Sequence, residues 1–151
     1  AHSVDEDVVG RKLLQYHAGI FASPDYIARH FDRASPGGAG VTWIGWGTAA
    51  QDRNWIRNSP FPNADVRHST PDGFMHLNLA LRGMGMTILP CFARHFGTGL
   101  QLMPGTTAYP DRSIWLLLHG DLKQSVRVRL LVEFLATELK KRRALFEDSG
   151  R

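Results

Sequence analysis

The fold of this chain is decided by one stretch of sequence, Ser69-Thr-Pro-Asp-Gly-Phe-Met-His-Leu-Asn-Leu-Ala-Leu-Arg-Gly-Met-Gly-Met-Thr-Ile-Leu-Pro90. The stretch opens with a helix start signal. Ser69 or Thr70 is predicted to be the N-cap, because a side-chain hydroxyl accepts a hydrogen bond from the first turn. Pro71 suits the first helical position, where no N–H donor is needed, and Asp72 favours the positive end of the helix dipole.

The remainder of the stretch predicts a helix, a tight turn and a buried strand in that order. Apolar residues follow the start signal closely, namely Phe74, Met75, Leu77, Leu79 and Leu81. Other elements are therefore expected to cover most of this helix. Gly83 supplies the stop, because glycine enters the left-handed region at little cost. Residues 84–89 then form a buried strand, which Pro90 ends, and the three parts make half of an α/β unit.

The flanking sequence predicts a mixed α/β layer domain around this unit. Strands are expected over residues 13–22, 41–46, 54–56, 65–68, 100–103 and 113–119, the last of them buried on both faces. Further helices are expected over residues 23–31, 91–96 and from 125 onwards. The last helix is amphipathic and has to pack against another element.

Length and charge limit the function classes. With 151 residues, 43% of them hydrophobic, the chain is one domain, or part of a larger one, with a real core. Residues 1–122 are formally neutral, so the net charge of +4 arises in residues 123–151, around the run Lys140–Arg143. We interpret this run as a solvated helix end; the alternative, a nucleic-acid patch, lacks interleaved aromatic residues.

The cysteine count and the hydropathy give weaker constraints. Cys91 is the only cysteine, which excludes an internal disulfide and favours a reducing compartment. No apolar run approaches 18 residues and no signal peptide is recognisable, so we expect no membrane span. The chain begins with Ala1 rather than Met, as expected of a piece of a longer protein.

Most candidate catalytic patterns fail a test of spacing. His68, Ser69 and Asp72 are close in sequence, but triad residues normally come from separate elements, and no G-x-S-x-G elbow is present. The seven histidines show neither H-E-x-x-H nor a Cys/His cluster, so no metal site is expected. A nucleophilic Cys91 at a helix start remains an alternative, although a lone cysteine is more often a small buried residue.

Two features are left as binding candidates. The hydroxyls of Ser69 and Thr70 beside free N–H groups form a modest anion site, unless they only cap their own helix. Trp43, Trp46 and Trp55 line an apolar pocket or belong to the core.

Two segments resemble one known family. Residues 21–30, Phe-Ala-Ser-Pro-Asp-Tyr-Ile-Ala-Arg-His, are similar to the "A-S-P-x-Y-L-A-R-H" segment of LysR-type transcriptional regulators. Residues 80–90, Ala-Leu-Arg-Gly-Met-Gly-Met-Thr-Ile-Leu-Pro, are similar to that family's "A-x-x-G-x-G-I-x-x-L-P". Residues 100–104, 114–116 and 125–135 follow in the family's order, so the resemblance covers most of the chain.

The resemblance implies an effector-binding fold of two subdomains, like the type 2 periplasmic binding proteins, with a small molecule between them. On that template, residues 1–12 lead in from the first subdomain, residues 13–119 form the second subdomain with two crossover strands, and residues 120–151 return a long helix to the first. The N-terminal winged helix-turn-helix and most of the first subdomain lie outside this chain. The long helix is then expected to expose an apolar stripe.

The resemblance also implies the site. It places Ser69 and Thr70 at a helix start facing the cleft, and Leu89 and Pro90 at a strand-to-helix turn. Trp46 and Ser23 are further candidates. The ligand is expected to be a small organic molecule, often an anion, bound without a cofactor or metal. The whole protein is expected to be a non-enzymatic, cytoplasmic homo-oligomer that binds DNA and does not bind membranes.

Two alternatives remain open on the sequence alone. An exported solute-binding protein shares the fold and would carry a signal peptide upstream. A small hydrolase using Cys91 would show thiol-dependent turnover.

Overall fold

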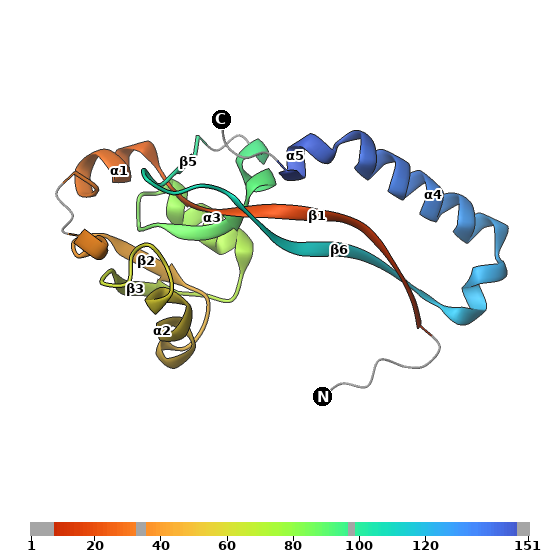
Figure 1. Ribbon diagram of the computed structural model, residues 1–151, viewed down its shortest axis with the longest axis horizontal. Coiled ribbons are helices and arrows are strands. Elements are labelled where there is room, and N and C mark those ends of the chain that lie inside the picture. The colour runs from red at the N-terminus through yellow and green to blue at the C-terminus, as the bar shows by residue number, and fades with distance from the viewer. Residues whose placement is uncertain (1–7, 33–35, 97–98, 148–151) are drawn as a thin grey trace.

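The computed structural model describes residues 8–32, 36–96 and 99–147 as a lobe with a long arm (Figure 1). The arm is an antiparallel ladder of β1 (Val8–Ala22) and β6 (Tyr109–His119), paired from Val8 with His119 to Ala18 with Tyr109. Register shifts interrupt this ladder between Lys12 and Leu14 and between Gln15 and His17. The strand β1 begins at Val8, earlier than the predicted start at residue 13.

The inner end of β1 belongs to the sheet of the lobe. The strands β4 (Thr87–Pro90) and β5 (Gln101–Leu102) pair with it in antiparallel fashion. A parallel pair, β2 (Thr42–Gly45) and β3 (Asp65–Ser69), adjoins β4 through Met86. The N–H of Ile44 donates to the Met86 carbonyl at 2.9 Å, and the N–H of Met86 donates to the Thr42 carbonyl at 2.8 Å. Hence β2, β3 and β4 run in one direction, and their carboxyl ends share one edge.

Helices follow these strands along the chain. They are α1 (Pro24–His30), α2 (Ala49–Arg57), α3 (Gly73–Leu81), α4 (Val126–Lys141) and α5 (Arg143–Glu147), with short 3₁₀ turns η1 (Pro36–Gly38), η2 (Cys91–Phe96) and η3 (Gly120–Gln124). Consequently α2, α3 and η2 all begin at the edge where β2, β3 and β4 end. The mixed α/β architecture predicted from the sequence is confirmed.

Local start and stop signals explain α1 and the end of α3. Ser23 caps α1, its hydroxyl accepting a hydrogen bond from the N–H of Tyr26 at 3.2 Å. Gly83 ends α3 as predicted: its φ is +69°, and its N–H donates to the Ala80 carbonyl at 3.0 Å. A side chain at this position would be strained by the left-handed backbone.

The prediction of a strand over residues 54–56 is wrong, because these residues lie inside α2. A capping box starts this helix: the Thr48 hydroxyl accepts from the N–H of Gln51, and the Gln51 side chain accepts from the N–H of Thr48. This reciprocal pair satisfies two N–H groups at once, so it favours the helix over the extended conformation.

The predicted cap of α3 is also wrong. The cap is Asp72, whose carboxylate accepts from the N–H of Met75 at 2.8 Å. The chain is still extended at Thr70, whose N–H donates to the Gly45 carbonyl at 2.9 Å, and a residue before a proline disfavours helical angles. The helix therefore starts after Pro71, and Ser69 and Thr70 precede it.

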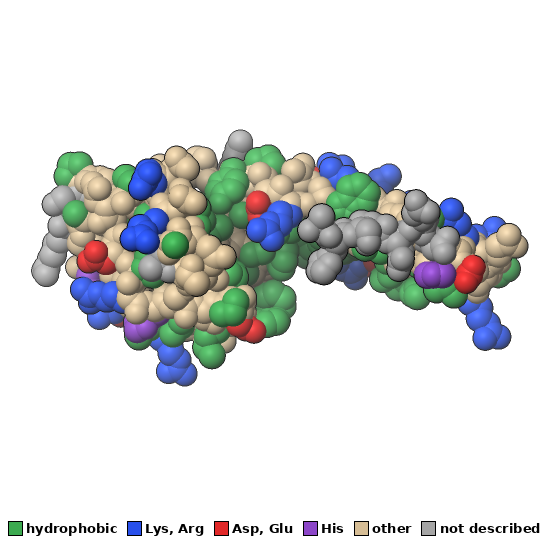
Figure 2. All heavy atoms as spheres, turned by 90° about the horizontal axis from the view of Figure 1, so that it is seen from below, with side chains coloured by type: hydrophobic (Ala, Val, Ile, Leu, Met, Phe, Trp, Pro, Cys, Tyr) green, Lys and Arg blue, Asp and Glu red, His purple; other side chains and the backbone are tan. Residues whose placement is uncertain are grey.

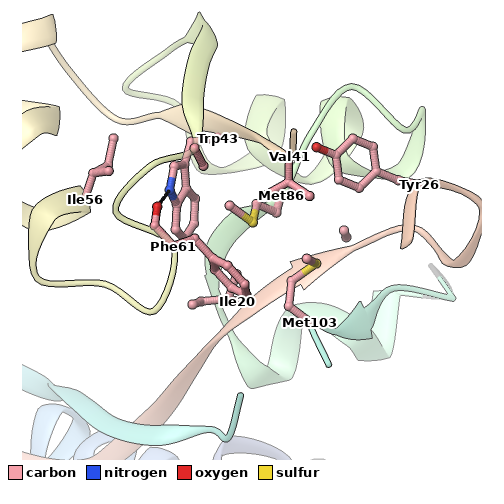
Figure 3. Packing of buried hydrophobic residues seen from close by; sticks show 10 residues of the cluster. Ile20, Tyr26, Val41, Trp43, Ile56, Phe61, Met86 and Met103 are labelled. Atoms are coloured by element: carbon pink, nitrogen blue, oxygen red, sulfur yellow. Dashed lines mark hydrogen bonds between the residues drawn. The ribbon is translucent and has the colours of Figure 1, made fainter. Parts of the chain in front are cut away.

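The core of the lobe is built around Trp43 on β2, which is fully buried (Figure 3). Its indole N–H donates to the Phe61 carbonyl at 3.2 Å, and its ring meets the Trp55 ring edge-on with centroids 4.9 Å apart. Trp43 and Trp55 are thus core residues. Tyr26, in the same cluster, accepts a hydrogen bond on its hydroxyl from the N–H of Thr42 at 2.6 Å.

The arm, by contrast, is poorly covered. Its strand β6 was predicted to be buried on both faces, which is wrong, because Trp115 and Leu117 are 55% and 64% exposed. On α4, the apolar face is open, as the resemblance led us to expect for a helix whose packing partner lies mostly outside this chain, and Leu130 and Phe134 are about as exposed as those two residues. Figure 2 shows hydrophobic side chains at the surface along the arm.

We predict that Tyr26→Phe lowers the free energy of unfolding by about 1–3 kcal/mol, because the buried N–H of Thr42 loses its acceptor. Urea unfolding measures the change. Tyr109→Phe is the control, since the Tyr109 ring is 40% exposed and its hydroxyl bonds no described backbone group. Equal effects of the two substitutions would contradict this role of Tyr26.

Candidate functional site

The candidate site lies where β2, β3 and β4 end. Trp46 follows β2, Ser69 and Thr70 end and follow β3, and Leu89 and Pro90 close β4. In α/β sheets, ligands bind outside the carboxyl ends of parallel strands, where helix N-termini also point. This edge of the lobe is therefore the place where its sheet is suited to hold a small molecule.

The two hydroxyls predicted to face a ligand differ in what they bond. The Ser69 hydroxyl donates to the Gly47 carbonyl at 2.5 Å and lies 3.4 Å from the Asp52 carboxylate. The Thr70 hydroxyl accepts from the N–H of Asp72 at 3.3 Å, and its proton has no acceptor among the described residues. Thr70 can therefore donate to a ligand without breaking a bond, whereas Ser69 can only accept unless it releases Gly47.

A buried carboxylate, that of Asp52 on α2, fixes the loop after β2. The residue is 1% exposed, and one oxygen accepts from the backbone N–H of Trp46 at 3.0 Å and from the indole N–H of Trp55 at 2.9 Å. Gly45 makes room for it, since a Cβ there would lie 2.2 Å from the other oxygen. These two N–H donors replace part of the water that a buried carboxylate loses, and no described cation forms an ion pair with it.

His76, fully buried on α3, holds the chain on either side of the site. Its Nε2 lies 2.8 Å from the Thr70 carbonyl, which only accepts, so Nε2 carries the proton. Its Nδ1 lies 2.5 Å from the Thr87 hydroxyl. The imidazole also stacks on the Trp46 ring, with centroids 3.6 Å apart and planes 12° apart. One side chain thus orients both Thr70 and Trp46.

The environment of His76 favours its neutral form. Burial lowers the pKa of the imidazole below its ordinary value of 6.5, and this outweighs the opposing effects of the hydrogen bond to Thr70 and of the charges on Asp52 and Asp72. A neutral ring donates through Nε2 and accepts from the Thr87 hydroxyl through Nδ1, which matches both contacts.

The other predicted site residues are less well placed. Leu89 is 3% exposed within the second core cluster, and Pro90 is half-buried beside it. Ser23 follows β1, which runs antiparallel to β4, so it lies at the opposite edge of the sheet, where its hydroxyl caps α1. Trp46, Ser69 and Thr70 are brought together, and Ser23 is not among them.

Of the residues discussed for the site, Asp52 also lines a hollow of the lobe. This hollow, beside α2, has a volume of about 500 Å³ and is lined by residues 52–53, 56–57 and 62–66.

Nothing in the described part of the chain forms a metal site of three or more His, Cys, Asp or Glu residues. Cys91, at the start of η2, is 1% exposed and packs in the second core cluster. Among the described helices, none is long and apolar enough to cross a membrane.

The fold is an α/β lobe in which three parallel strands end at one edge. A family model described as "LysR substrate binding domain" matches residues 1–140. The chain therefore belongs to the LysR substrate-binding domain family, the ligand-sensing regulatory part of LysR-type transcriptional regulators, and the resemblance seen in the sequence is confirmed. No curated protein sequence matched the chain.

Solved structures agree on the fold. The regulatory domain of CrgA, a LysR-type transcriptional regulator from Neisseria meningitidis, aligns with a TM-score of 0.67 at 19% identity over 92% of this chain and 72% of that one. The C-terminal domains of a LysR family protein from Agrobacterium tumefaciens align with a TM-score of 0.61 at 21% identity, over 87% of this chain and 66% of that one. The AmpR effector binding domain from Citrobacter freundii aligns with a TM-score of 0.63 at 17% identity, over 90% of this chain and 70% of that one. This chain spans half of a longer CrgA chain.

Sequence reasoning missed Asp52 and His76. Most of their partners come from other elements: Trp46 and Ser69 for Asp52, besides Trp55 on its own helix, and residues 46, 70 and 87 for His76. The sequence offers only a weak signal for them, because each is a polar residue on the buried face of its helix.

We predict that His76 makes the fold less stable in mild acid. Because its pKa is lower in the folded state, only the unfolded chain takes up a proton as the pH falls below about 6.5, and unfolding becomes easier. Above that pH both states are neutral and the effect is absent. Urea midpoints at pH 7.5 and 5.5 should therefore drop further for the parent than for His76→Gln, whose amide can still donate to Thr70. An equal drop in both proteins would contradict the assignment.

Proposed function

We propose that the chain senses a small organic effector at the edge formed by the carboxyl ends of β2, β3 and β4. One observation carries this proposal: Trp46, Ser69 and Thr70 converge there, and buried His76 contacts two of the three. Side chains held by a second layer of contacts keep the geometry that ligand recognition needs.

The chemistry of this edge favours an effector with a hydrogen-bond acceptor such as a carboxylate. The Thr70 hydroxyl offers its proton, and the first N–H groups of α3, those of Gly73 and Phe74, have no partner within the helix. Asp72 already caps this helix end through Met75, so an anion there gains less than at an uncapped end. A single carboxylate facing Thr70 fits better than a polyanion.

The division of the chain between two subdomains suggests how an effector would regulate the protein. We assign residues 13–119 to a second subdomain and residues 120–151 to the closing helix of a first one, with residues 1–12 leading in. An effector bound between two subdomains shifts their arrangement only if it binds one arrangement more tightly. In a cytoplasmic homo-oligomer, that shift would act on DNA through an N-terminal winged helix-turn-helix domain outside these residues.

The two alternatives gain no support from the site. A nucleophile has to reach its substrate, and the Cys91 side chain packs among apolar neighbours of the core. The family match also favours a regulator over an exported solute-binding protein of the same fold. We therefore propose a non-enzymatic sensor.

We predict that Ser69→Ala combined with Thr70→Val weakens binding of the effector by about 1–3 kcal/mol, with most of the loss from Thr70→Val, because only this hydroxyl has an uncommitted proton. A screen of small carboxylic acids by thermal shift identifies the effector, and calorimetry measures its affinity.

Thr137→Val is the matched control, since Thr137 is exposed on α4, far along the chain from the site. It should leave the affinity unchanged. An effector whose affinity is the same in the parent and in both variants would remove the site assignment, although the family membership would stand.

A further inference from the structure

A second, basic hollow lies between β1 and the α4–α5 junction, away from the candidate effector site. Its volume is about 450 Å³. Nine residues line it, namely Arg11, Lys12, Leu13, Leu14, Gln15, Ala136, Lys140, Arg143 and Glu147. We call this site the basic hollow.

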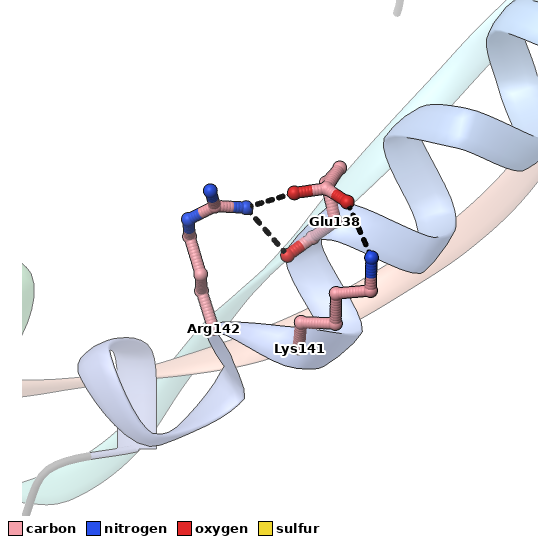
Figure 4. Close-up of polar contacts among 3 residues, drawn as sticks. All are labelled: Glu138, Lys141 and Arg142. Atoms are coloured by element: carbon pink, nitrogen blue, oxygen red, sulfur yellow. Dashed lines mark hydrogen bonds and ion pairs between the residues drawn. The ribbon is translucent and has the colours of Figure 1, made fainter.

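Of the four basic residues at positions 140–143, only Lys140 and Arg143 line the helical side of the basic hollow. Ala136 and Lys140 are four residues apart on α4, Arg143 and Glu147 are four residues apart on α5, and all four line the hollow. The two cations between Lys140 and Arg143 turn elsewhere: Lys141 Nζ bonds the Glu138 carboxylate at 2.8 Å, and Arg142 bonds its other oxygen (Figure 4). The run is therefore divided into a pair that shares the single charge of Glu138 and a pair, Lys140 and Arg143, that lines the hollow.

The charge in the basic hollow is unbalanced. Four cations line it against one carboxylate, that of Glu147, which bonds Arg143 Nε at 2.6 Å. Within the described residues, Arg11, Lys12 and Lys140 form no ion pair. The lining of one concavity thus carries three positive charges that have no ion-pair partner among the described residues, and the surrounding protein concentrates their potential.

The shape of the site suits a small ligand better than an extended one. Leu14, 7% exposed, and Ala136 supply apolar wall, and the Gln15 amide is held by the Asp111 carbonyl at 3.3 Å. Strand and helix close the hollow from two sides. Guanidinium and ammonium groups from separate elements then surround a ligand rather than forming a flat stripe along the surface.

We infer that the basic hollow is a second ligand site, which binds a small phosphate-bearing anion with two or more negative charges. Arg11 and Arg143 donate to phosphate oxygens from opposite walls, and Lys12 and Lys140 add point charges. Because the anion contacts both β1 and the α4–α5 junction, it ties the closing helix to the crossover strand. Occupancy of this site does not depend on the proposed effector site.

Pyrophosphate is the probe, titrated by calorimetry into the purified protein at low ionic strength. The parent is expected to bind it, and Arg11→Gln with Lys140→Gln should lose about tenfold or more in affinity, because two of the uncompensated charges are gone. Neither substitution breaks an ion pair. The exchange Arg11→Lys with Lys140→Arg retains the charges and should keep the affinity within about threefold.

The matched control is Arg127→Gln with Arg129→Gln, which removes the same charge from exposed positions of α4 outside the basic hollow. It should change the affinity by less than about twofold. An equal loss of affinity in both double variants would mean that net charge alone explains the binding, and it would overturn the inference. The inference would also be overturned if the parent did not bind pyrophosphate. A comparable loss in Ser69→Ala with Thr70→Val would place pyrophosphate at the effector site and also overturn it.

Discussion

The Asp52 carboxylate is the interaction on which the candidate site depends. It is buried at the start of α2, and it accepts hydrogen bonds from the backbone N–H of Trp46 beyond β2 and from the Trp55 ring, with the Ser69 hydroxyl that ends β3 3.4 Å away. Each of these donors would have to find another partner if the carboxylate moved, so the ends of two parallel strands and the start of one helix are fixed together. Gly45 is required at the strand end because any side chain would occupy the space of the carboxylate.

Local signals in the sequence predicted those elements whose partners are near in the chain. Ser23 and Gly83 bond residues three positions away, and both were identified correctly as a helix start and a helix stop. The start of α3 was placed too early, because the backbone bond from Thr70 to Gly45 keeps the chain extended past the predicted cap. That bond joins residues far apart in sequence, so local propensity could not indicate it.

In the candidate site, too, the sequence predicted some residues and not those whose roles depend on distant partners. Helix-start chemistry and the resemblance together led to Ser69 and Thr70, and its place near a strand end led to Trp46; the structure places all three at one edge of the sheet. The residues behind them were not predicted, since Asp52 and His76 acquire their roles only when β2, α2 and α3 come together. The exposure of β6 and α4 was equally hidden from periodicity: an apolar pattern shows which face is suited to burial and not whether a neighbour covers it.

The two register shifts in the β1–β6 ladder have a mechanical consequence. They fall between Lys12 and Leu14 and between Gln15 and His17, close to where the arm joins the lobe. An interrupted ladder has fewer cross-strand hydrogen bonds and a stronger local twist, so its bending stiffness is lowest there. The same segment of β1 forms one wall of the basic hollow. The interrupted part of the ladder thus adjoins three cations that have no ion pair among the described residues, and salt screens the repulsion between them.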